Sequence, residues 1–142
     1  MRKKAPEGYR PLGGLSPFNA MIGPLYARRR RGVELSIGLL IERKHTNSRG
    51  ICHGGLLATL ADLSLGYAMH ARAPQDGGFV TAHLAVDYAG SARMGDWIHS
   101  EVEIQRMGTR LAFANCYLVT GDRRRIVRAS AIFARAGQKR EE

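Results

Sequence analysis

The feature that most constrains this chain is the stretch from Asn47 to Gly66, which joins a polar loop, a His53-Gly54-Gly55 turn and an apolar segment. From Leu56 onward leucine, alanine and threonine dominate, and this pattern predicts a helix with both glycines in its first turn. A helix that is apolar nearly all round has to be buried over most of its surface. The rest of the chain must therefore supply a layer that wraps around it.

The segments on either side of this helix alternate as strands do, most clearly from Val33 to Ile41. We expect strands at residues 25–29, 33–41, 79–88, 96–106, 110–120 and 125–135, the last four as a meander. A short helix is expected at 16–23, with Ser16 as its N-cap. Turns are expected at the glycine-containing segments 73–78, 107–109 and 121–122. One long helix among strands predicts an α+β fold, in which an antiparallel sheet curls about the helix and the helix face left exposed meets another subunit.

A chain of 142 residues fits one domain. We expect a flexible N-terminal segment at 1–14, a single domain at 15–136 and a charged C-terminal tail at 137–142. No apolar run is long enough to span a membrane, and no apolar segment follows the basic start, so we expect no membrane partner and a cytoplasmic location. Cys52 and Cys116 lie far apart in sequence, which predicts reduced thiols rather than a disulfide or a metal-binding pair. A buried thiol is favoured over a nucleophile for Cys52.

The formal net charge of +10 comes mostly from arginine, notably in the runs 28–31 and 123–125. Arginine clusters suit phosphate-bearing partners. No DNA-binding or RNA-binding motif accompanies them, so we expect no nucleic-acid partner. Taken alone, each run is better explained as a solvated turn between strands.

Two features of the central helix could carry chemistry. Its N-terminus offers backbone N–H groups without helical partners, and Gly54 and Gly55 allow a ligand to approach them closely. Asp62 lies among leucine and alanine residues, where an ionised carboxylate is costly unless it is hydrogen-bonded or functional. For an isolated carboxylate on such a helix, a structural role is favoured over a catalytic one. On the next strand, alternation places Thr81 and His83 on one face, about 6–7 Å apart.

Several of these residues recur together in a known family. The run His45-Thr46-Asn47, then Gly50, His53-Gly54-Gly55, Asp62 and Gly66, resembles the hotdog-fold acyl-CoA thioesterases of the phenylacetate-degradation (PaaI-like) type. The resemblance extends from about Ser16 to Arg135, and it includes Thr81, the Asp87-Tyr88 step, Gly95-Asp96 and Gly108-Thr109-Arg110. It reverses the preference for Asp62, which is now expected to be catalytic. The sequence departs from the family at Ala85, where asparagine is common, and near His83, so the pocket or the substrate preference is expected to differ.

The resemblance implies a hotdog fold, with about six antiparallel strands around one helix, and a homodimer or homotetramer with active sites at the dimer interface. It implies hydrolysis of an acyl-CoA or aryl-CoA thioester, without a metal or other cofactor. The Gly54 and Gly55 amides and Asn47 of one subunit would polarise the carbonyl. Asp62 of the partner would act as general base on water, or less favourably as a nucleophile, with Thr81 positioning the base or the water. His53 is assigned to shaping the turn and holding the Asn47 loop.

Spacing independently favours a shared site. Gly55 and Asp62 are seven residues apart, which is about 10 Å along one helix. A donor to a carbonyl and a base acting on that carbonyl must both lie within about 3 Å of the reacting atoms or one water away. One helix is therefore a poor source of both groups.

Some assignments stay open at this point. Arg93, Arg106 and Arg110 are candidates for binding CoA phosphates, and His83 could be a second titrating group in the site. Leu56, Leu60, Tyr67 and Phe79 could line the acyl pocket or belong to the core. The alternatives to a thioesterase are a non-catalytic acyl-CoA sensor, a phosphate-binding or nucleic-acid-binding module and a hotdog hydratase. A hydratase needs an acid/base pair, whereas the helix carries Asp62 without an adjacent histidine.

Overall fold

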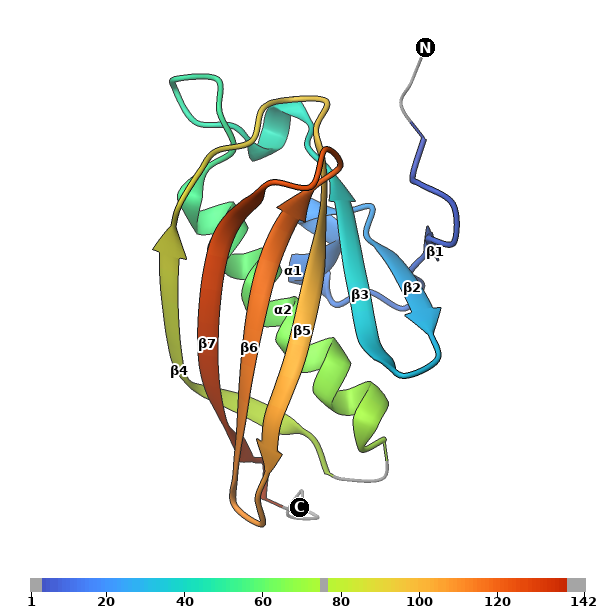
Figure 1. Ribbon diagram of the computed structural model, residues 1–142, viewed down its shortest axis with the longest axis vertical. Coiled ribbons are helices and arrows are strands. Elements are labelled where there is room, and N and C mark those ends of the chain that lie inside the picture. Colours follow the sequence, from blue (N-terminus) through green and yellow to red (C-terminus); the bar gives the residue numbers. More distant parts are fainter. Residues whose placement is uncertain (1–3, 75–76, 138–142) are drawn as a thin grey trace.

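The computed structural model describes residues 4–74 and 77–137. It contains one seven-stranded antiparallel sheet with the order β1-β2-β3-β5-β6-β7-β4. The sheet curves around a single long helix, α2 (Figure 1). The strands are β1 (Arg10–Pro11), β2 (Tyr26–Arg30), β3 (Val33–Leu40), β4 (Phe79–Tyr88), β5 (Trp97–Met107), β6 (Leu111–Thr120) and β7 (Arg125–Arg135). The helices are α1 (Pro17–Ile22), the 3₁₀ turn η1 (Arg43–His45) and α2 (Gly54–Arg72).

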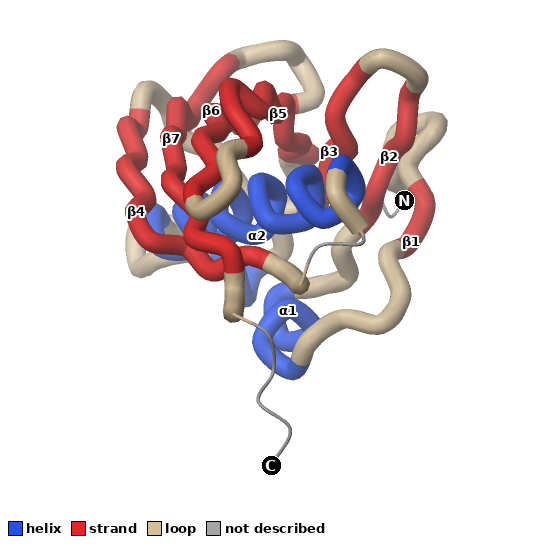
Figure 2. The backbone as a smooth tube through the Cα atoms, turned by 90° about the horizontal axis from the view of Figure 1, so that it is seen from below, coloured by secondary structure: helices blue, strands red, loops and turns tan. Residues whose placement is uncertain are grey.

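Helix α2 buries one face against the sheet and leaves the other partly exposed. Its buried residues are Leu56, Leu57, Leu60, Ala61, Ser64, Leu65, Ala68 and Met69. They recur at the spacing of a helical face and pack with core residues of β3, β6 and β7. α1 lies on the side of α2 that faces away from the sheet (Figure 2). The hotdog architecture and the helix predicted after the His-Gly-Gly turn are confirmed.

The short helix α1 begins as expected. The Ser16 side chain accepts a hydrogen bond from the Asn19 N–H at 3.2 Å, and Pro17 occupies the first helical position. Both features are favourable at a helix start because they satisfy or remove backbone donors that would lack partners.

The predicted four-strand meander is wrong in one respect. β5, β6 and β7 do follow one another, but β4 pairs with β7 and lies at the far edge of the sheet. The connection from β4 to β5 spans residues 89–96 and crosses over the end of the sheet near the start of α2 (Figure 1). This crossover allows the sheet to close around both sides of the helix.

A β-bulge interrupts β4. Thr81 pairs with Phe133 and His83 pairs with Ile132, so Ala82 is an extra residue without a partner on β7. A bulge changes which side chains point to each face of a sheet. Thr81 contacts α2 before the bulge, whereas Leu84 and Val86 pack against the core after it. The regular alternation predicted for this strand is therefore wrong.

The N-terminal segment expected to be flexible includes residues that pack on the sheet. β1 pairs with β2, and Tyr9 is buried with its hydroxyl 2.7 Å from the Ser36 Oγ. The Tyr9 ring also meets the Trp97 ring edge-on and lies under the Arg28 guanidinium. Residues 1–3 of that segment, residues 75–76 of the predicted turn and residues 138–142 of the predicted tail lie outside the described residues. No helix in the described ranges is long and apolar enough to cross a membrane.

Candidate active site

The start of α2 is capped by His53. Its Nδ1 accepts a hydrogen bond from the Gly55 N–H at 2.8 Å. A side chain at position 55 would place its Cβ 3.0 Å from that same nitrogen, so glycine leaves room for the imidazole ring. The cap uses the Gly55 amide, which was predicted to donate to a substrate carbonyl. Gly54, which is half-buried, belongs to the same first turn, and N–H groups of a first turn point out of the helix end.

Tyr88 ties the end of β4 to this helix start. Its hydroxyl donates to the Gly54 carbonyl oxygen at 2.7 Å. Sequence reasoning missed this contact, although it noted Tyr88 within the resemblance. The sequence signal that could have predicted it was strand alternation. Tyr88 lies two residues after Val86, so both side chains point to the face of β4 that packs on the core.

Asn47 lies in a tight loop just before the cap. Its Oδ1 accepts hydrogen bonds from the N–H of Arg49 at 2.9 Å and of Ile51 at 3.4 Å. Its own N–H donates to the Ile51 carbonyl at 2.8 Å. Because the amide oxygen is held by the loop, the NH₂ group is the end of this side chain that can donate to a ligand.

His45 links this loop to the rest of the fold. It is buried, its Nδ1 accepts from the Glu42 N–H at 2.9 Å, and its Nε2 lies 2.6 Å from the Ile22 carbonyl oxygen, to which it donates in this tautomer. Its carbonyl oxygen accepts from the His53 N–H at 2.8 Å. Burial lowers the pKa of His45 below its ordinary value of 6.5. Sequence reasoning gave His45 no role, and its place in the site could have been suspected only from the quoted resemblance.

Asp62 and Thr81 are brought together. The Thr81 hydroxyl donates to the Asp62 Oδ1 at 2.7 Å, joining the middle of α2 to the first half of β4. Asp62 is half-buried on the side of the helix that faces away from the core, and Thr81 is exposed. The carboxylate is therefore hydrogen-bonded and still open to solvent.

His83 does not join this pair. The bulge at Ala82 turns it away from the face that carries Thr81, and its side chain is exposed. The prediction that Thr81 and His83 share one face is wrong, because it assumed an uninterrupted strand.

The three arginines proposed for phosphate binding lie at two ends of the molecule. Arg93 forms a β-bridge with Ile51 and so lies beside the Asn47 loop. Arg106 lies near the end of β5, and Arg110 lies in the β5–β6 hairpin, where its carbonyl accepts from the Arg135 N–H. One chain therefore does not bring all three together at a single ligand.

The two cysteines and the possible metal ligands add no further chemistry. Burial raises the pKa of Cys52 to about 11 and, with help from the Glu101 charge, that of Cys116 to about 12. Both thiols are therefore protonated at neutral pH, which disfavours a nucleophilic Cys52. Within residues 4–74 and 77–137, no three His, Cys, Asp or Glu side chains are arranged to hold a metal ion.

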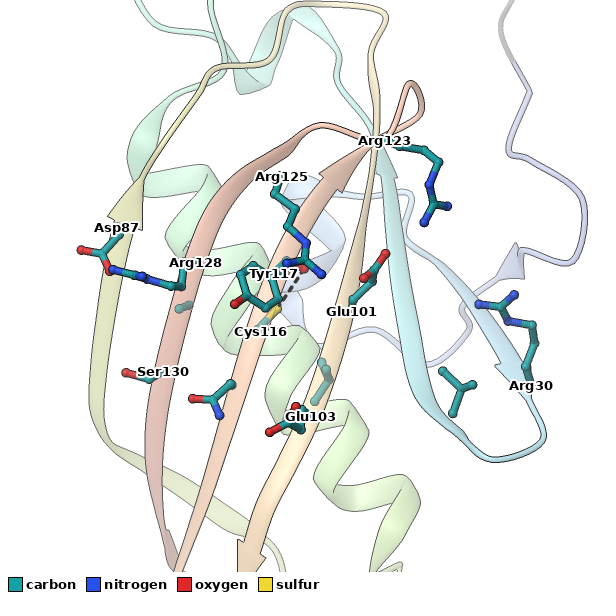
Figure 3. Close-up of a pocket in the computed structure, with 14 residues that line it drawn as sticks. Arg30, Asp87, Glu101, Glu103, Cys116, Tyr117, Arg123, Arg125, Arg128 and Ser130 are labelled. Atoms are coloured by element: carbon teal, nitrogen blue, oxygen red, sulfur yellow. Dashed lines mark hydrogen bonds and ion pairs between the residues drawn. The ribbon is translucent and has the colours of Figure 1, made fainter.

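A surface hollow lies elsewhere on the molecule. It measures about 630 Å³ and lies on the outer face of the sheet, opposite α2 (Figure 3). Two of its four arginines have local partners, since Arg125 stacks on Tyr117 and Arg128 pairs with Asp87 at 3.0 Å. None of the predicted catalytic residues lines it. The chemistry indicated by Asp62 and the helix start lies on the other side of the sheet.

Comparison with known proteins supports the interpretation of this fold. The model of the thioesterase superfamily matches residues 49–127. A Pseudomonas aeruginosa protein provisionally named as esterase PA0474 is 41% identical over 128 residues, covering 90% of this chain and 95% of the relative. Two solved structures are similar in fold. The Escherichia coli PaaI protein from the phenylacetic acid degradation operon has a TM-score of 0.67 at 19% identity over 72% of each chain. The smu.793 protein of Streptococcus mutans, bound to acetyl CoA, has a TM-score of 0.76 at 17% identity over 89% of this chain and 96% of its own.

The family model and the relative named as an esterase identify a thioester hydrolase. The chain belongs to the thioesterase superfamily. The family resemblance seen in the sequence is thereby confirmed.

Proposed function

We propose that this protein is an acyl-CoA thioesterase that hydrolyses an acyl-CoA or aryl-CoA to the free acid and CoA. The observation that carries the proposal is the 2.7 Å hydrogen bond from Thr81 to Asp62 on the open side of α2. A carboxylate that is held in place and still reached by solvent is suited to take a proton from water. The S. mutans protein of the same fold, bound to acetyl CoA, is consistent with a CoA ester as substrate.

In the proposed reaction Asp62 is the general base. Thr81 holds one carboxylate oxygen and leaves the other to accept a proton as water attacks the thioester carbon. The attack gives a tetrahedral oxyanion, and collapse of this intermediate breaks the C–S bond and expels the CoA thiolate, which takes up the proton that Asp62 received and so regenerates the carboxylate. Backbone amides aimed at the developing oxyanion supply the main stabilisation.

The oxyanion donors belong to the helix start. The Gly54 amide and the Asn47 NH₂ group are the proposed donors, and the Gly55 amide joins them only if His53 releases it. Gly54 and Asp62 are eight residues apart, about 12 Å along α2, so they cannot serve the same carbonyl within one chain. The proposed site therefore combines the helix start of one subunit with Asp62 and Thr81 of a second.

A dimer through β4 would bring these two half-sites together. β4 is a ten-residue strand at the edge of the sheet, where backbone donors and acceptors are available for a second copy. Val80 on this strand is 56% exposed, which leaves apolar surface for a partner to cover. The proposed assembly is a homodimer, or a tetramer built from such dimers.

The test is release of free thiol from a panel of short-chain, medium-chain, long-chain and aryl-CoA esters. We expect turnover with at least one ester, and a loss of about a hundredfold or more in kcat for Asp62→Asn, as is typical when a general base is removed. Glu103→Gln is the matched control and should leave kcat unchanged, because Glu103 is an exposed carboxylate on the outer face of the sheet. Equal activity of Asp62→Asn and wild type would refute the mechanism. A wild-type protein that binds CoA esters and releases no thiol would indicate a sensor instead.

A further inference from the structure

At the start of α2, the Gly54 N–H differs from the N–H groups on either side of it. The Gly55 N–H donates to the His53 Nδ1 at 2.8 Å, and the His53 N–H donates to the His45 carbonyl at 2.8 Å. In the described part of the chain, the Gly54 N–H has no hydrogen-bond partner. A first-turn N–H also has no acceptor inside its own helix. Gly54 therefore carries the amide that can donate to a substrate carbonyl.

The carbonyl end of Gly54 is held by Tyr88, whose hydroxyl donates to it at 2.7 Å. The peptide group between Gly54 and Gly55 is thus fixed at both ends, because its N–H is bound to His53. Glycine has more backbone freedom than any other residue, and the N–H groups of a first turn make no bonds inside the helix. A contact from outside the helix therefore restricts the backbone that carries the Gly54 N–H.

Tyr88 is itself placed by the sheet. It is the last residue of β4 and pairs with Val127 of β7, which is buried. The next N–H along the chain, that of Ala89, donates to the Ile126 carbonyl at 2.9 Å. The Tyr88 ring also lies against the helix start, since a Cβ built at Gly54 would be 3.5 Å from the ring. The hydroxyl is consequently presented to Gly54 by a supported strand end.

We infer that Tyr88 is a positioning residue for thioester hydrolysis: its hydroxyl holds the Gly54 peptide so that the Gly54 N–H is aimed at the developing oxyanion. The inference rests on the proposed function. Removing an oxyanion donor outright costs about 100- to 1,000-fold in kcat. Tyr88 acts through Gly54 rather than on the ester, so its effect should be smaller. One ordinary hydrogen bond corresponds to about 3- to 10-fold.

The test compares wild type with Tyr88→Phe, which removes the hydroxyl and keeps the ring. Tyr88 is 52% exposed, so this variant is expected to fold. Thiol release is measured with the ester that wild type hydrolyses fastest. We expect kcat to fall about 3- to 10-fold and KM to stay within about twofold, because the oxyanion forms only after the ester is bound.

Tyr117→Phe is the matched control. Tyr117 lies on β6 at the outer face of the sheet, and its ring carries the Arg125 guanidinium. Loss of its hydroxyl should leave both kcat and KM unchanged.

Infrared spectra of a bound ester separate positioning from a purely structural contact. The Asp62→Asn background slows turnover, so an ester with an isotope-labelled carbonyl can be observed in the site. Hydrogen bonds to a carbonyl oxygen lower its stretching frequency. The band of Asp62→Asn/Tyr88→Phe should therefore lie at a higher frequency than that of Asp62→Asn. The band of Asp62→Asn/Tyr117→Phe should not move.

The outcomes decide this inference separately from the proposed function. An unchanged kcat in Tyr88→Phe, or a slower enzyme whose carbonyl band does not move, would overturn the role of Tyr88 and leave thioesterase activity standing. A raised KM with unchanged kcat would make Tyr88 a substrate contact and would also overturn it. If wild type hydrolyses no ester, the proposed function fails, and spectra of wild type and Tyr88→Phe with the intact ester test the contact alone. A displaced band would then support it, whereas identical bands or no binding of any ester would overturn it.

Discussion

At the scale of single residues, Thr81 shows how a side chain can act through another. Its hydroxyl holds one oxygen of Asp62 at 2.7 Å. A hydrogen bond to a charged group contributes about 1.5–3 kcal/mol, so Thr81→Val should lower kcat by roughly 10- to 100-fold. KM should change little, because Thr81 is expected to orient the base rather than to bind the ester. Steady-state kinetics with the best substrate measures both quantities.

Thr81→Ser is the control for this effect. It keeps the hydroxyl and removes one methyl group, so kcat should recover to within about threefold of wild type if the hydrogen bond is what matters. A serine variant as slow as the valine variant would mean that Thr81 acts through packing in the edge strand.

At the scale of elements, His45 connects α1, η1 and the loop that leads into α2. It accepts from Glu42, donates to Ile22 at the end of α1 and receives the His53 N–H on its carbonyl. These contacts need a neutral ring with an unprotonated Nδ1. The loop that carries Asn47 is therefore held by a residue whose protonation state depends on pH.

This arrangement predicts a loss of stability in mild acid. The pKa of folded His45 is lowered from 6.5, chiefly by burial, so below about pH 6.5 the unfolded state binds more protons than the folded state. Stability should be constant above about pH 7.5 and fall as the pH drops through 6.5. Thermal unfolding of wild type and His45→Gln at pH 8, 7, 6 and 5 measures this. The difference in Tm between the two proteins should shrink as the pH falls.

His99 provides the necessary comparison. Burial also lowers its pKa, and the Glu101, Arg28 and Arg123 charges act on it as well. The part of the acid-induced fall in Tm that comes from His99 should remain in the His45→Gln protein and disappear in the His99→Gln protein. A Tm difference between wild type and His45→Gln that stays constant from pH 8 to pH 5 would contradict the role given to His45.

At the scale of the whole molecule, the proposed site needs two chains. Mixing Asn47→Ala with Asp62→Ala subunits should restore activity, because each mixed dimer has one site with both residues intact. Random exchange of equal amounts makes about half of the dimers mixed, so recovery should approach about a quarter of the wild-type rate. The recovered rate is measured as thiol release after subunit exchange, and native mass spectrometry verifies that mixed dimers have formed. Complete exchange without recovery would place both residues in one chain's site.

Features set by local pattern could be predicted from the sequence. The start of α2, the bounds of β4 and β7 and the Ser16 cap all follow from periodicity, glycine and capping chemistry within a few residues. The Asp62–Thr81 contact was expected from the family resemblance rather than from spacing. Whether these residues catalyse thioester hydrolysis is a prediction that the experiments above address.

Features set by distant contacts could not be predicted. The pairing of β4 with β7 depends on how the sheet closes around α2, which no local pattern records. The burial of Tyr9 depends on Arg28 and Trp97, and the use of the Gly55 amide depends on the rotamer of His53. The face assigned to His83 failed because one unpaired residue, Ala82, reversed the alternation that follows it.

The bulge at Ala82 divides β4 into two halves whose inward side chains contact different parts of the molecule. The half before Ala82 supplies Thr81, which donates to Asp62, while the half after it packs Leu84 and Val86 on the core and places Tyr88 at the helix start. Because the two halves contact different neighbours, a substitution before Ala82 can change the surroundings of Asp62 without disturbing the half that anchors the strand. The edge of the sheet is thus a place where specificity could diverge among relatives while the fold stays the same.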